Sequence, residues 1–393
     1  MDVPATTVDW RSKGFWLPGG ERSASWYATT RPGLFEGGFT WPLLTLRRSA
    51  ALGNIELMAA YSRRHGLDFA PHVKTTMAPG LIAAQLSAGA WGLTVATPNQ
   101  ALVLYRLGVP RVFIANEVLD PVALRWLASV PDFEVYLQVD SLAGVAAAAA
   151  VPSGRLRVFV ELGHAGGRTG ARSLDELSAV AEAVCSAPRL SLVGVTGYEG
   201  QLPDEASVDD FLDTMAAGVS RLKGLLPAEP LVSAGGSAWF DRVVARLSGF
   251  RVLLRSGASV THDDGFYRER TPFRRVPAEG PLTAALELWG QVISTPEPGL
   301  AIVGMGKRDA PFDEGLPVVH ELRRDGSSSA PPGLSVTKMN DHHTYVAAGS
   351  SPLVPGDLIR FGISHPCTAF DKWRDIPVVD DEHRVVDVLH TYF

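Results

Sequence analysis

The feature that most constrains the fold is an alternation of short apolar runs with longer amphipathic or alanine-rich runs, between about residues 68 and 259. The short runs are rich in β-branched residues and bounded by Gly, Pro, Asn or Asp, which is typical of buried strands. They are Phe69–Val73, Leu93–Ala96, Val112–Ala115, Phe133–Val139, Val158–Leu162, Leu192–Tyr198, Leu231–Ala234 and Val252–Arg255. Helices are predicted between them, for example at Ala78–Ala90, Leu174–Ala187 and Val208–Leu225. Eight strands with seven intervening helical segments predict a (β/α)8 TIM-type barrel, although a doubly wound open sheet uses the same alternation.

After about Thr271 the pattern changes to one strand after another, with little helix between. These strands are predicted at Leu282–Ile293, Ala301–Val303, Leu334–Thr337, Thr344–Ala347, Leu358–Phe361 and Val385–Leu389. Turn signals such as Pro298-Gly299 and Pro355-Gly356 separate them, and the polar run Arg323–Pro332 is predicted to be a mobile loop. The C-terminal part is therefore predicted to be a β-rich domain.

The residues before the first barrel strand contain one predicted strand, Trp41–Leu46, and one predicted helix, Arg48–His65. That strand could pair with the C-terminal domain instead of the barrel. We therefore expect an N-terminal segment (1–67) partly packed on the β-rich domain, a barrel (68–270) and the β-rich domain itself (271–393).

Composition excludes several function classes. With 393 residues, 46% of them hydrophobic, the chain can bury a large core without disulfides or structural metals. A net charge of −6 argues against nucleic acid as a partner, and no apolar run is long enough to span a membrane. The first residues lack the apolar core of a signal peptide, and two cysteines, Cys185 and Cys367, make no disulfide framework. The expected protein is cytoplasmic and acts on a small molecule, with Cys185 in the core.

Lys74 is the first candidate for chemistry. It directly follows the first predicted barrel strand, and side chains at the carboxyl ends of barrel strands point into the active site. Desolvation there would lower its pKa and make it a nucleophile or a base. Only six of the 36 Lys and Arg residues are lysines, so a residue that merely covers surface would more naturally be arginine. The alternative is a solvated lysine at a strand end.

Two glycine-rich loops, Gly235-Gly236-Ser237 and Ser256-Gly257, follow the seventh and eighth predicted strands. Loops in these positions bind phosphate in many barrels, because glycine lets backbone N–H groups approach the anion and hydroxyls add donors. Each loop alone could be an ordinary tight turn. Together with Lys74, they indicate pyridoxal phosphate held as a Schiff base.

A third signal lies in His365-Pro366-Cys367. On a strand end, residues two apart point to one face, and imidazole nitrogen and thiolate sulfur are good zinc ligands. The alternative is a buried cysteine beside a capping histidine. Upstream, His342-His343 could add a base, or could be a solvated turn.

These segments, together with Gly167–Gly170 and Gly197–Gly200, occur in an order that resembles the D-serine dehydratase and D-threonine aldolase family. That family belongs to the alanine-racemase-like, fold type III pyridoxal phosphate enzymes, and the resemblance runs from about Trp41 to Phe393. It implies a barrel that holds the cofactor, a β-rich domain that carries the metal, and a homodimer.

The resemblance also implies roles for individual residues. Lys74 would carry the cofactor, Arg168 would contact the pyridine ring or its 3′-oxygen, and Tyr198 would face the ring nitrogen. The remaining cofactor contacts would be His72, Gly235, Gly236, Ser237, Ser256 and Gly257, and the metal ligands would be His365 and Cys367. A thiolate ligand favours Zn²⁺, with Mn²⁺ or another divalent ion as the alternative.

The expected reaction is dehydration and deamination of a D-3-hydroxy amino acid to a 2-oxo acid and ammonia. Lys74 would remove the α-proton while the metal, as a Lewis acid, assists departure of the β-hydroxyl. The alternative is retro-aldol cleavage to glycine and an aldehyde, with His343 as the base. An amino-acid racemase, which needs no metal, and a non-catalytic cofactor carrier are further alternatives.

Overall fold

The computed structural model describes residues 3–330, 333–349 and 352–393. Its N-terminal half is an eight-stranded parallel sheet in the order β4-β11-β10-β9-β8-β7-β6-β5. A parallel bridge between His72 and Thr94 and a hydrogen bond from Trp91 N–H to Phe69 C=O join the two end strands. The predicted (β/α)8 barrel is thereby confirmed. Its strands are β4 (Asp68–Phe69), β5 (Leu93–Val95), β6 (Arg111–Glu117), β7 (Glu134–Val139), β8 (Leu156–Leu162), β9 (Leu190–Gly197), β10 (Leu231–Ala234) and β11 (Arg251–Leu254).

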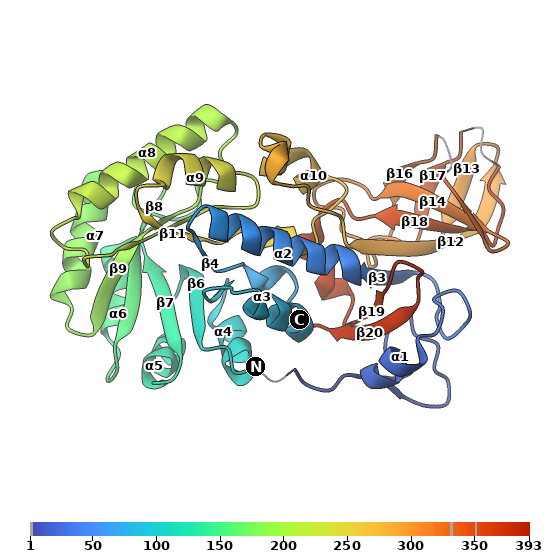
Figure 1. Ribbon diagram of the computed structural model, residues 1–393, viewed down its shortest axis with the longest axis horizontal. Coiled ribbons are helices and arrows are strands. Elements are labelled where there is room, and N and C mark those ends of the chain that lie inside the picture. Colours follow the sequence, from blue (N-terminus) through green and yellow to red (C-terminus); the bar gives the residue numbers. More distant parts are fainter. Residues whose placement is uncertain (1–2, 331–332, 350–351) are drawn as a thin grey trace.

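Helices surround the barrel, and local sequence explains where they begin. Thr97, Asp120, Ser141, Ser173 and Asp204 each accept a hydrogen bond from a backbone N–H in the first turn of the helix that follows. The helices are α2 (Arg48–Arg64), α3 (Pro79–Ser87), α4 (Pro98–Arg106), α5 (Pro121–Ser129), α6 (Leu142–Ala149), α7 (Leu174–Ser186), α8 (Glu205–Arg221) and α9 (Phe240–Leu247). Figure 1 shows α2 running along the molecule from the barrel toward the second sheet.

The barrel interior is filled with apolar side chains below its carboxyl-terminal mouth. The inward-pointing side chains Phe113, Tyr136, Phe159 and Leu253 pack together there. A larger apolar layer lies between strands and helices. Because the interior is packed, the strand ends and loops at the mouth are left to form a site.

The C-terminal part is β-rich, as predicted, and its strands are antiparallel except for the parallel pair β3–β19. One sheet path runs β15-β14-β18-β12-β13-β17-β16, and β3 pairs with both β12 and β19. The strands are β3 (Leu43–Arg47), β12 (Leu286–Glu297), β13 (Leu300–Val303), β14 (Val318–Arg324), β15 (Ser327–Ser329), β16 (Ser335–Met339), β17 (Thr344–Ala347), β18 (Leu358–Gly362), β19 (Asp375–Val379) and β20 (Val385–His390). The smaller elements are β1 (Thr7–Val8), β2 (Arg22–Ser23), α1 (Ala24–Thr30) and α10 (Phe266–Arg270).

The polar run Arg323–Pro332 differs from its prediction as a loop. Residues Arg323 and Arg324 end β14, Asp325-Gly326 turn with positive φ, and Ser327–Ser329 return as β15. An edge hairpin built from polar residues lacks the apolar runs by which a strand is recognised, so its sequence resembles that of a loop. Pro331 and Pro332 lie outside the described residues.

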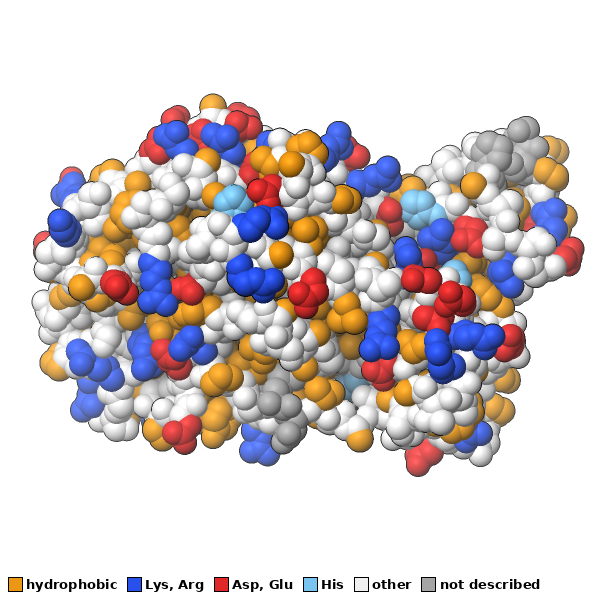
Figure 2. All heavy atoms as spheres, viewed as in Figure 1, with side chains coloured by type: hydrophobic (Ala, Val, Ile, Leu, Met, Phe, Trp, Pro, Cys, Tyr) orange, Lys and Arg blue, Asp and Glu red, His pale blue; other side chains and the backbone are white. Residues whose placement is uncertain are grey.

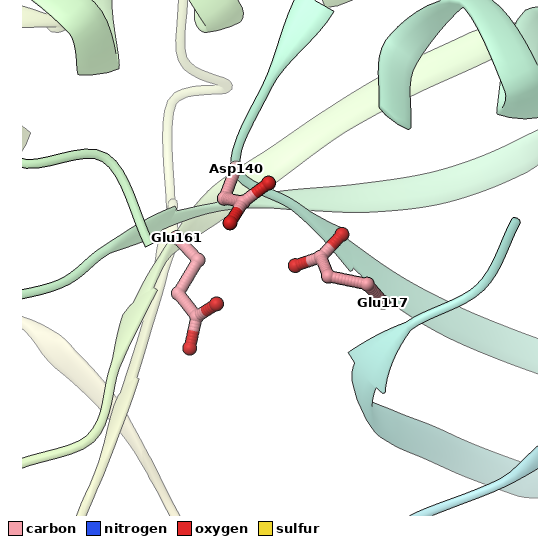
Figure 3. Close-up of side chains that lie close together, drawn as sticks. All are labelled: Glu117, Asp140 and Glu161. Carbon is pink, nitrogen blue, oxygen red and sulfur yellow. The ribbon is translucent and has the colours of Figure 1, made fainter. Parts of the chain in front are cut away.

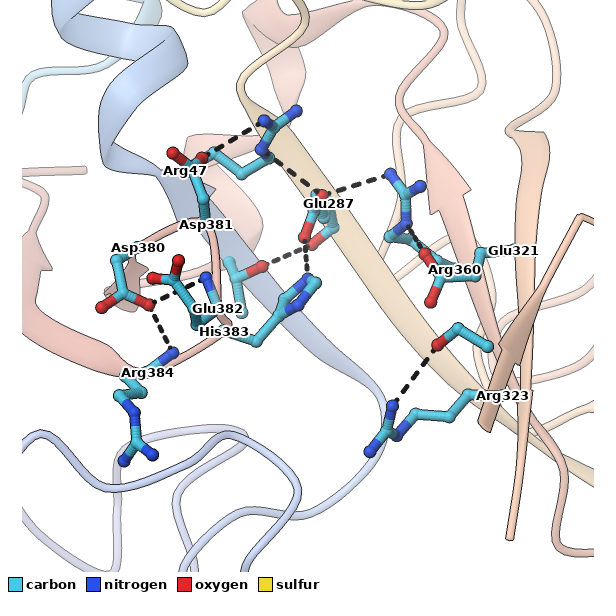
Figure 4. Close-up of polar contacts among 12 residues, drawn as sticks. Arg47, Glu287, Glu321, Arg323, Arg360, Asp380, Asp381, Glu382, His383 and Arg384 are labelled. Carbon is cyan, nitrogen blue, oxygen red and sulfur yellow. Dashed lines mark hydrogen bonds and ion pairs between the residues drawn. The ribbon is translucent and has the colours of Figure 1, made fainter. Parts of the chain in front are cut away.

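A buried carboxylate fastens the N-terminal segment to the second sheet (Figure 4). Glu287 on β12 lies 3.1 Å from Arg360 on β18 and 3.1 Å from His383, and 3.8 Å from Arg47 at the end of β3. Burial raises the pKa of Glu287, but the hydrogen bond from His383 and the positive charge of Arg360 outweigh it and lower the pKa overall. These contacts join β12 to three other segments of the chain.

The surface carries charges of both signs. On the face shown in Figure 2, Lys and Arg side chains are interspersed with Asp and Glu side chains over both parts of the molecule. Among the described residues, no helix combines the length and the apolar character that crossing a membrane requires.

Candidate active site

One pocket lies at the mouth of the barrel, where strand ends meet the second domain. Its lining contains three cationic side chains, Lys74, Arg168 and Arg255, and none of the described lining residues is Asp or Glu. The pocket is therefore suited to an anionic ligand. It is lined by His72, Lys74, Thr75, Ala115, Arg168, Tyr198, Gly235, Gly236, Ser237, Arg255, Ser256, Gly257, Ala258, Tyr267 and Cys367.

Lys74 reaches this pocket from a short 3-10 turn, Val73–Thr75, that follows β4. The predicted strand Phe69–Val73 is shorter than expected, since only Asp68–Phe69 and the bridge at His72 pair with neighbours. Burial lowers the pKa of Lys74; the nearby Cys367 opposes that shift, while Arg168 and Arg255 add to it. A lysine in this environment holds its proton less firmly than a solvated one.

The two glycine-rich loops lie side by side, but their backbone donors are only partly free. The Glu199 carboxylate, on the loop after β9, accepts hydrogen bonds from Gly235 N–H at 3.1 Å and Gly236 N–H at 2.5 Å. Sequence reasoning missed this carboxylate, which is fully buried. The two amides that we expected to face a phosphate thus already have an acceptor.

Two serine hydroxyl groups connect the two glycine-rich loops. Ser256 Oγ donates to Ser237 Oγ at 3.1 Å, and Ala258 N–H donates to Ser237 Oγ at 3.2 Å. At Gly257 a Cβ would lie 2.3 Å from His72 C=O, so only glycine fits. The two loops thus form a compact cup around Ser237 Oγ, which accepts both of these hydrogen bonds.

Two arginines and a tyrosine form one wall. The exposed Arg168 guanidinium lies over the Tyr198 ring at 4.3 Å from its centroid. Arg255 is only 8% exposed, donates to Gly197 C=O, and its Nε has no hydrogen-bond partner among the described residues. Burial raises the pKa of Tyr198, and the neighbouring Glu199 charge raises it further. Tyr198 is therefore a neutral hydrogen-bond donor at ordinary pH.

His365 and Cys367 come together, although not on a strand as predicted. Pro366 begins a 3-10 turn, Pro366–Thr368, which follows β18 after a short link. His365 Nδ1 lies 2.8 Å from an Asp313 carboxylate oxygen, and Cys367 Sγ lies 3.6 Å from Thr75 Oγ1. Burial lowers the pKa of His365, but hydrogen bonds with Cys367 and Asp313 outweigh it and raise the pKa to about 9.

His342 and His343 do not reach the pocket. They form the exposed turn between β16 and β17, and neither is among the lining residues. His342 Nδ1 lies 3.8 Å from the buried Asp309 instead. Two adjacent histidines suggested chemistry, but both lie exposed on the turn of a hairpin.

Five lining residues were not among the predicted contacts, namely Thr75, Ala115, Arg255, Ala258 and Tyr267. Arg255 directly follows β11, the eighth barrel strand, so the same strand-end argument that identified Lys74 would have found it. Tyr267 enters from α10, and its ring centroid lies 5.8 Å from that of His365. Thr75 directly follows Lys74, so considering the neighbour of the predicted lysine would have identified it.

Comparison with known proteins agrees with this architecture. The chain matches the family model for the N-terminal domain of alanine racemase over residues 47–260 and the putative serine dehydratase domain over residues 285–379. A 3-hydroxy-D-aspartate aldolase from Paracoccus denitrificans is 28% identical over 349 residues, covering 85% of this chain and 87% of the relative.

Among solved structures, a D-threonine aldolase from Filomicrobium marinum superposes with a TM-score of 0.78 at 24% identity, over 90% of this chain and 95% of that one. A D-threo-3-hydroxyaspartate dehydratase from Delftia sp. HT23 gives 0.71 at 21% identity, over 90% and 97%. Alanine-substituted forms of a D-threo-3-hydroxyaspartate dehydratase, altered at a histidine and at a cysteine two positions later, are also similar, and the cysteine form is metal-free.

The alanine racemase match covers more than half of the chain, and the dehydratase match covers most of the C-terminal sheet. The chain therefore belongs to the D-serine dehydratase and D-threonine aldolase family of alanine-racemase-like pyridoxal phosphate enzymes.

Proposed function

We propose that this protein is a pyridoxal phosphate- and metal-dependent lyase that dehydrates a D-3-hydroxy amino acid to a 2-oxo acid and ammonia. The observation that carries the proposal is that Lys74 and Cys367 line one cationic pocket, with His365 two residues before Cys367. A base and a thiol that could bind a metal thus face the same small volume.

The residues fit the cofactor. The lining is cationic, the lysine is half-buried, and Ser237 and Ser256 present hydroxyls beside a glycine whose Cβ would collide with His72. Pyridoxal phosphate, when bound to Lys74, would supply an electron sink for charge left on the substrate's α-carbon. We expect the phosphate to lie against the Ser237 and Ser256 hydroxyls, because Glu199 holds the amides of Gly235 and Gly236.

The residues also fit a metal. His365 would offer its Nε2 atom, because its Nδ1 atom contacts Asp313, and Cys367 would offer its thiolate. A nitrogen and sulfur ligand pair suits Zn²⁺ better than Mn²⁺ or Mg²⁺. Such an ion would supply Lewis-acid polarisation of the substrate's β-hydroxyl group.

The protein's own side chains would do the rest. Lys74 Nζ, whose pKa is lowered by burial, would accept the α-proton of the substrate. Arg168 and Arg255 would attract the substrate carboxylate, and Tyr198 would donate a hydrogen bond from its neutral hydroxyl.

The comparisons bear on the competing reaction. The curated relative at 28% identity is an aldolase, which keeps retro-aldol cleavage as the second candidate. The spacing of His365 and Cys367 matches the histidine and cysteine altered in the structurally similar dehydratase, which favours dehydration. The exposed position of His343 also leaves the aldolase proposal without the base we expected.

The test is product analysis of the holoenzyme with D-threonine, D-serine and D-3-hydroxyaspartate, with and without a chelator. Dehydration predicts a 2-oxo acid and ammonia, lost on chelation and in Cys367→Ala, and kept in the matched control Cys185→Ala, whose side chain is exposed on α7. Glycine with an aldehyde would establish the aldolase instead. Racemised substrate that ignores the chelator would refute both.

A further inference from the structure

Three carboxylates converge inside the barrel, apart from the residues that line the pocket. Glu117 ends β6, Asp140 follows β7, and Glu161 lies on β8 (Figure 3). One oxygen atom from each can be chosen so that all of them lie within 4.8 Å of one another. Like charges so close must be neutralised by a proton or by a cation.

The register of the strands explains why these side chains meet. Gln138 is the parallel partner of Glu117 and lies two residues after Tyr136, a member of the apolar interior layer. Since strand side chains alternate, Gln138 and Asp140 continue the inward face of β7. By the same alternation Glu161, two residues after Phe159, continues the inward face of β8.

The cluster contains oxygen atoms that no donor satisfies. Glu161 Oε2, Glu117 Oε1 and Gln138 Oε1 are buried without a hydrogen-bond partner within the part of the chain that the structure describes. Gln138 is only 3% exposed, and it lies on the inward face of β7 directly beside Glu117, its parallel partner. Asp140 accepts one hydrogen bond, from Gly170 N–H at 3.1 Å.

Unsatisfied buried acceptors are costly, and several together point to a missing positive ligand. Burial and the negative charges of Asp140 and Glu161 raise the pKa of Glu117 to about 9. One shared proton could relieve part of this repulsion, but it would leave the Gln138 carbonyl oxygen without a partner.

We propose that Glu117, Gln138, Asp140 and Glu161 form a site for a hard divalent cation of the size of Ca²⁺. Oxygen ligands about 2.4 Å from Ca²⁺ can lie up to about 4.8 Å apart, so the carboxylate oxygens need little movement to bind it. The all-oxygen set disfavours Zn²⁺ and separates this site from the nitrogen and sulfur pair of His365 and Cys367. The proposal does not depend on the reaction that the pocket catalyses.

Terbium luminescence tests the site, because Tb³⁺ replaces Ca²⁺ at oxygen ligands and is sensitised by nearby aromatic rings. Tyr136 precedes Gln138 by two residues and lies 5.1 Å from Trp91, centroid to centroid. Holoenzyme carrying Cys367→Ala should give saturable Tb³⁺ emission that Ca²⁺ displaces. In that background, the double variant Glu117→Gln, Glu161→Gln should lose at least about 90% of the emission. The control double variant Glu182→Gln, Glu229→Gln changes two exposed residues and should keep the emission.

Thermal unfolding provides a second measurement in the same Cys367→Ala background. Ca²⁺ at about one hundred times its dissociation constant should raise the midpoint by about 5 °C, and the Glu117→Gln, Glu161→Gln variant should show no such rise. Absence of a Ca²⁺ effect, or equal emission from both double variants, would overturn the proposal and leave a shared proton as the neutralising group.

Discussion

Glu199 should stabilise the barrel mouth by holding two consecutive amides. Its buried carboxylate accepts from Gly235 N–H and Gly236 N–H, and Gly235 has a φ of +98°, a conformation that few residues other than glycine adopt. The substitution Glu199→Gln keeps the size of the side chain but replaces one acceptor oxygen with a donor.

The magnitude follows from these contacts. Hydrogen bonds to a charged acceptor contribute about 1.5–3 kcal/mol each, and glutamine can keep one of the two. The other amide would be left buried opposite an NH₂ group, so we expect the free energy of unfolding to fall by about 2 kcal/mol. Loss of the carboxylate also removes a negative charge that favours the charged form of buried Arg255.

The assay is urea unfolding of the protein, followed by tryptophan fluorescence, with Glu182→Gln on the surface of α7 as the matched control. A lower midpoint for Glu199→Gln and an unchanged midpoint for Glu182→Gln are expected. Equal midpoints in both variants would refute the role given to Glu199.

Three further predictions concern stability. Burial lowers the pKa of His262 to about 4, whereas in the unfolded chain it stays near its ordinary value of about 6.5. Below about pH 6.5 the unfolded state therefore binds a proton that the folded state does not. The free energy of unfolding should fall by about 2 kcal/mol between pH 7.5 and pH 5. His262→Asn, which tolerates the positive φ of this residue, should flatten that dependence in denaturant titrations at the two pH values. Gly257→Ala should destabilise the barrel by about 1–3 kcal/mol, because the new Cβ would lie 2.3 Å from His72 C=O; an unchanged melting temperature would contradict this contact. Asp357→Asn weakens the ion pair between the Asp357 carboxylate, which is 1% exposed, and the partly exposed Arg324. Because solvent screens Arg324, we expect the free energy of unfolding to fall by only about 1–2 kcal/mol in chemical denaturation. The control Asp325→Asn, in the nearby turn, should leave it unchanged.

The barrel could be predicted because its strands are buried on both faces and read as apolar runs bounded by turn residues. Strand topology then predicts much of the candidate site, because the carboxyl ends of the parallel strands meet at one mouth of the barrel. That single rule brings Lys74, Tyr198, Ser237 and Ser256 to one pocket. It also reaches Arg255, which no motif indicated.

Cys185 shows a failure that the sequence could have avoided. We expected it in the core, but it is exposed. The buried positions of α7 are Leu177, Val180, Ala181 and Val184, spaced three or four apart as on one helical face. The residue directly after Val184 turns about 100° from that face, so its exposure follows from helical periodicity.

His365 and Cys367 show a local structure that was predicted wrongly. We expected strand alternation to bring them to one face, whereas Pro366 begins a 3-10 turn that contains Cys367. Proline lacks the N–H that a ladder needs and fixes φ near the helical value, so a turn was the better expectation. The orienting carboxylate, Asp313, is 52 residues away in sequence and no local pattern could have identified it.

The glycine-rich loops show which part of a binding site a sequence motif predicts and which part it does not. Gly235-Gly236-Ser237 predicts that backbone donors converge, but not which acceptor they converge upon. In the barrel, β9 is the neighbour of β10, so the loop after β9 necessarily lies beside the loop after β10. Glu199 is on that neighbouring loop and supplies a permanent carboxylate to the donors. Which donors of a glycine-rich loop stay available to an anion therefore depends on the strand beside it, because that strand can supply a carboxylate that occupies them.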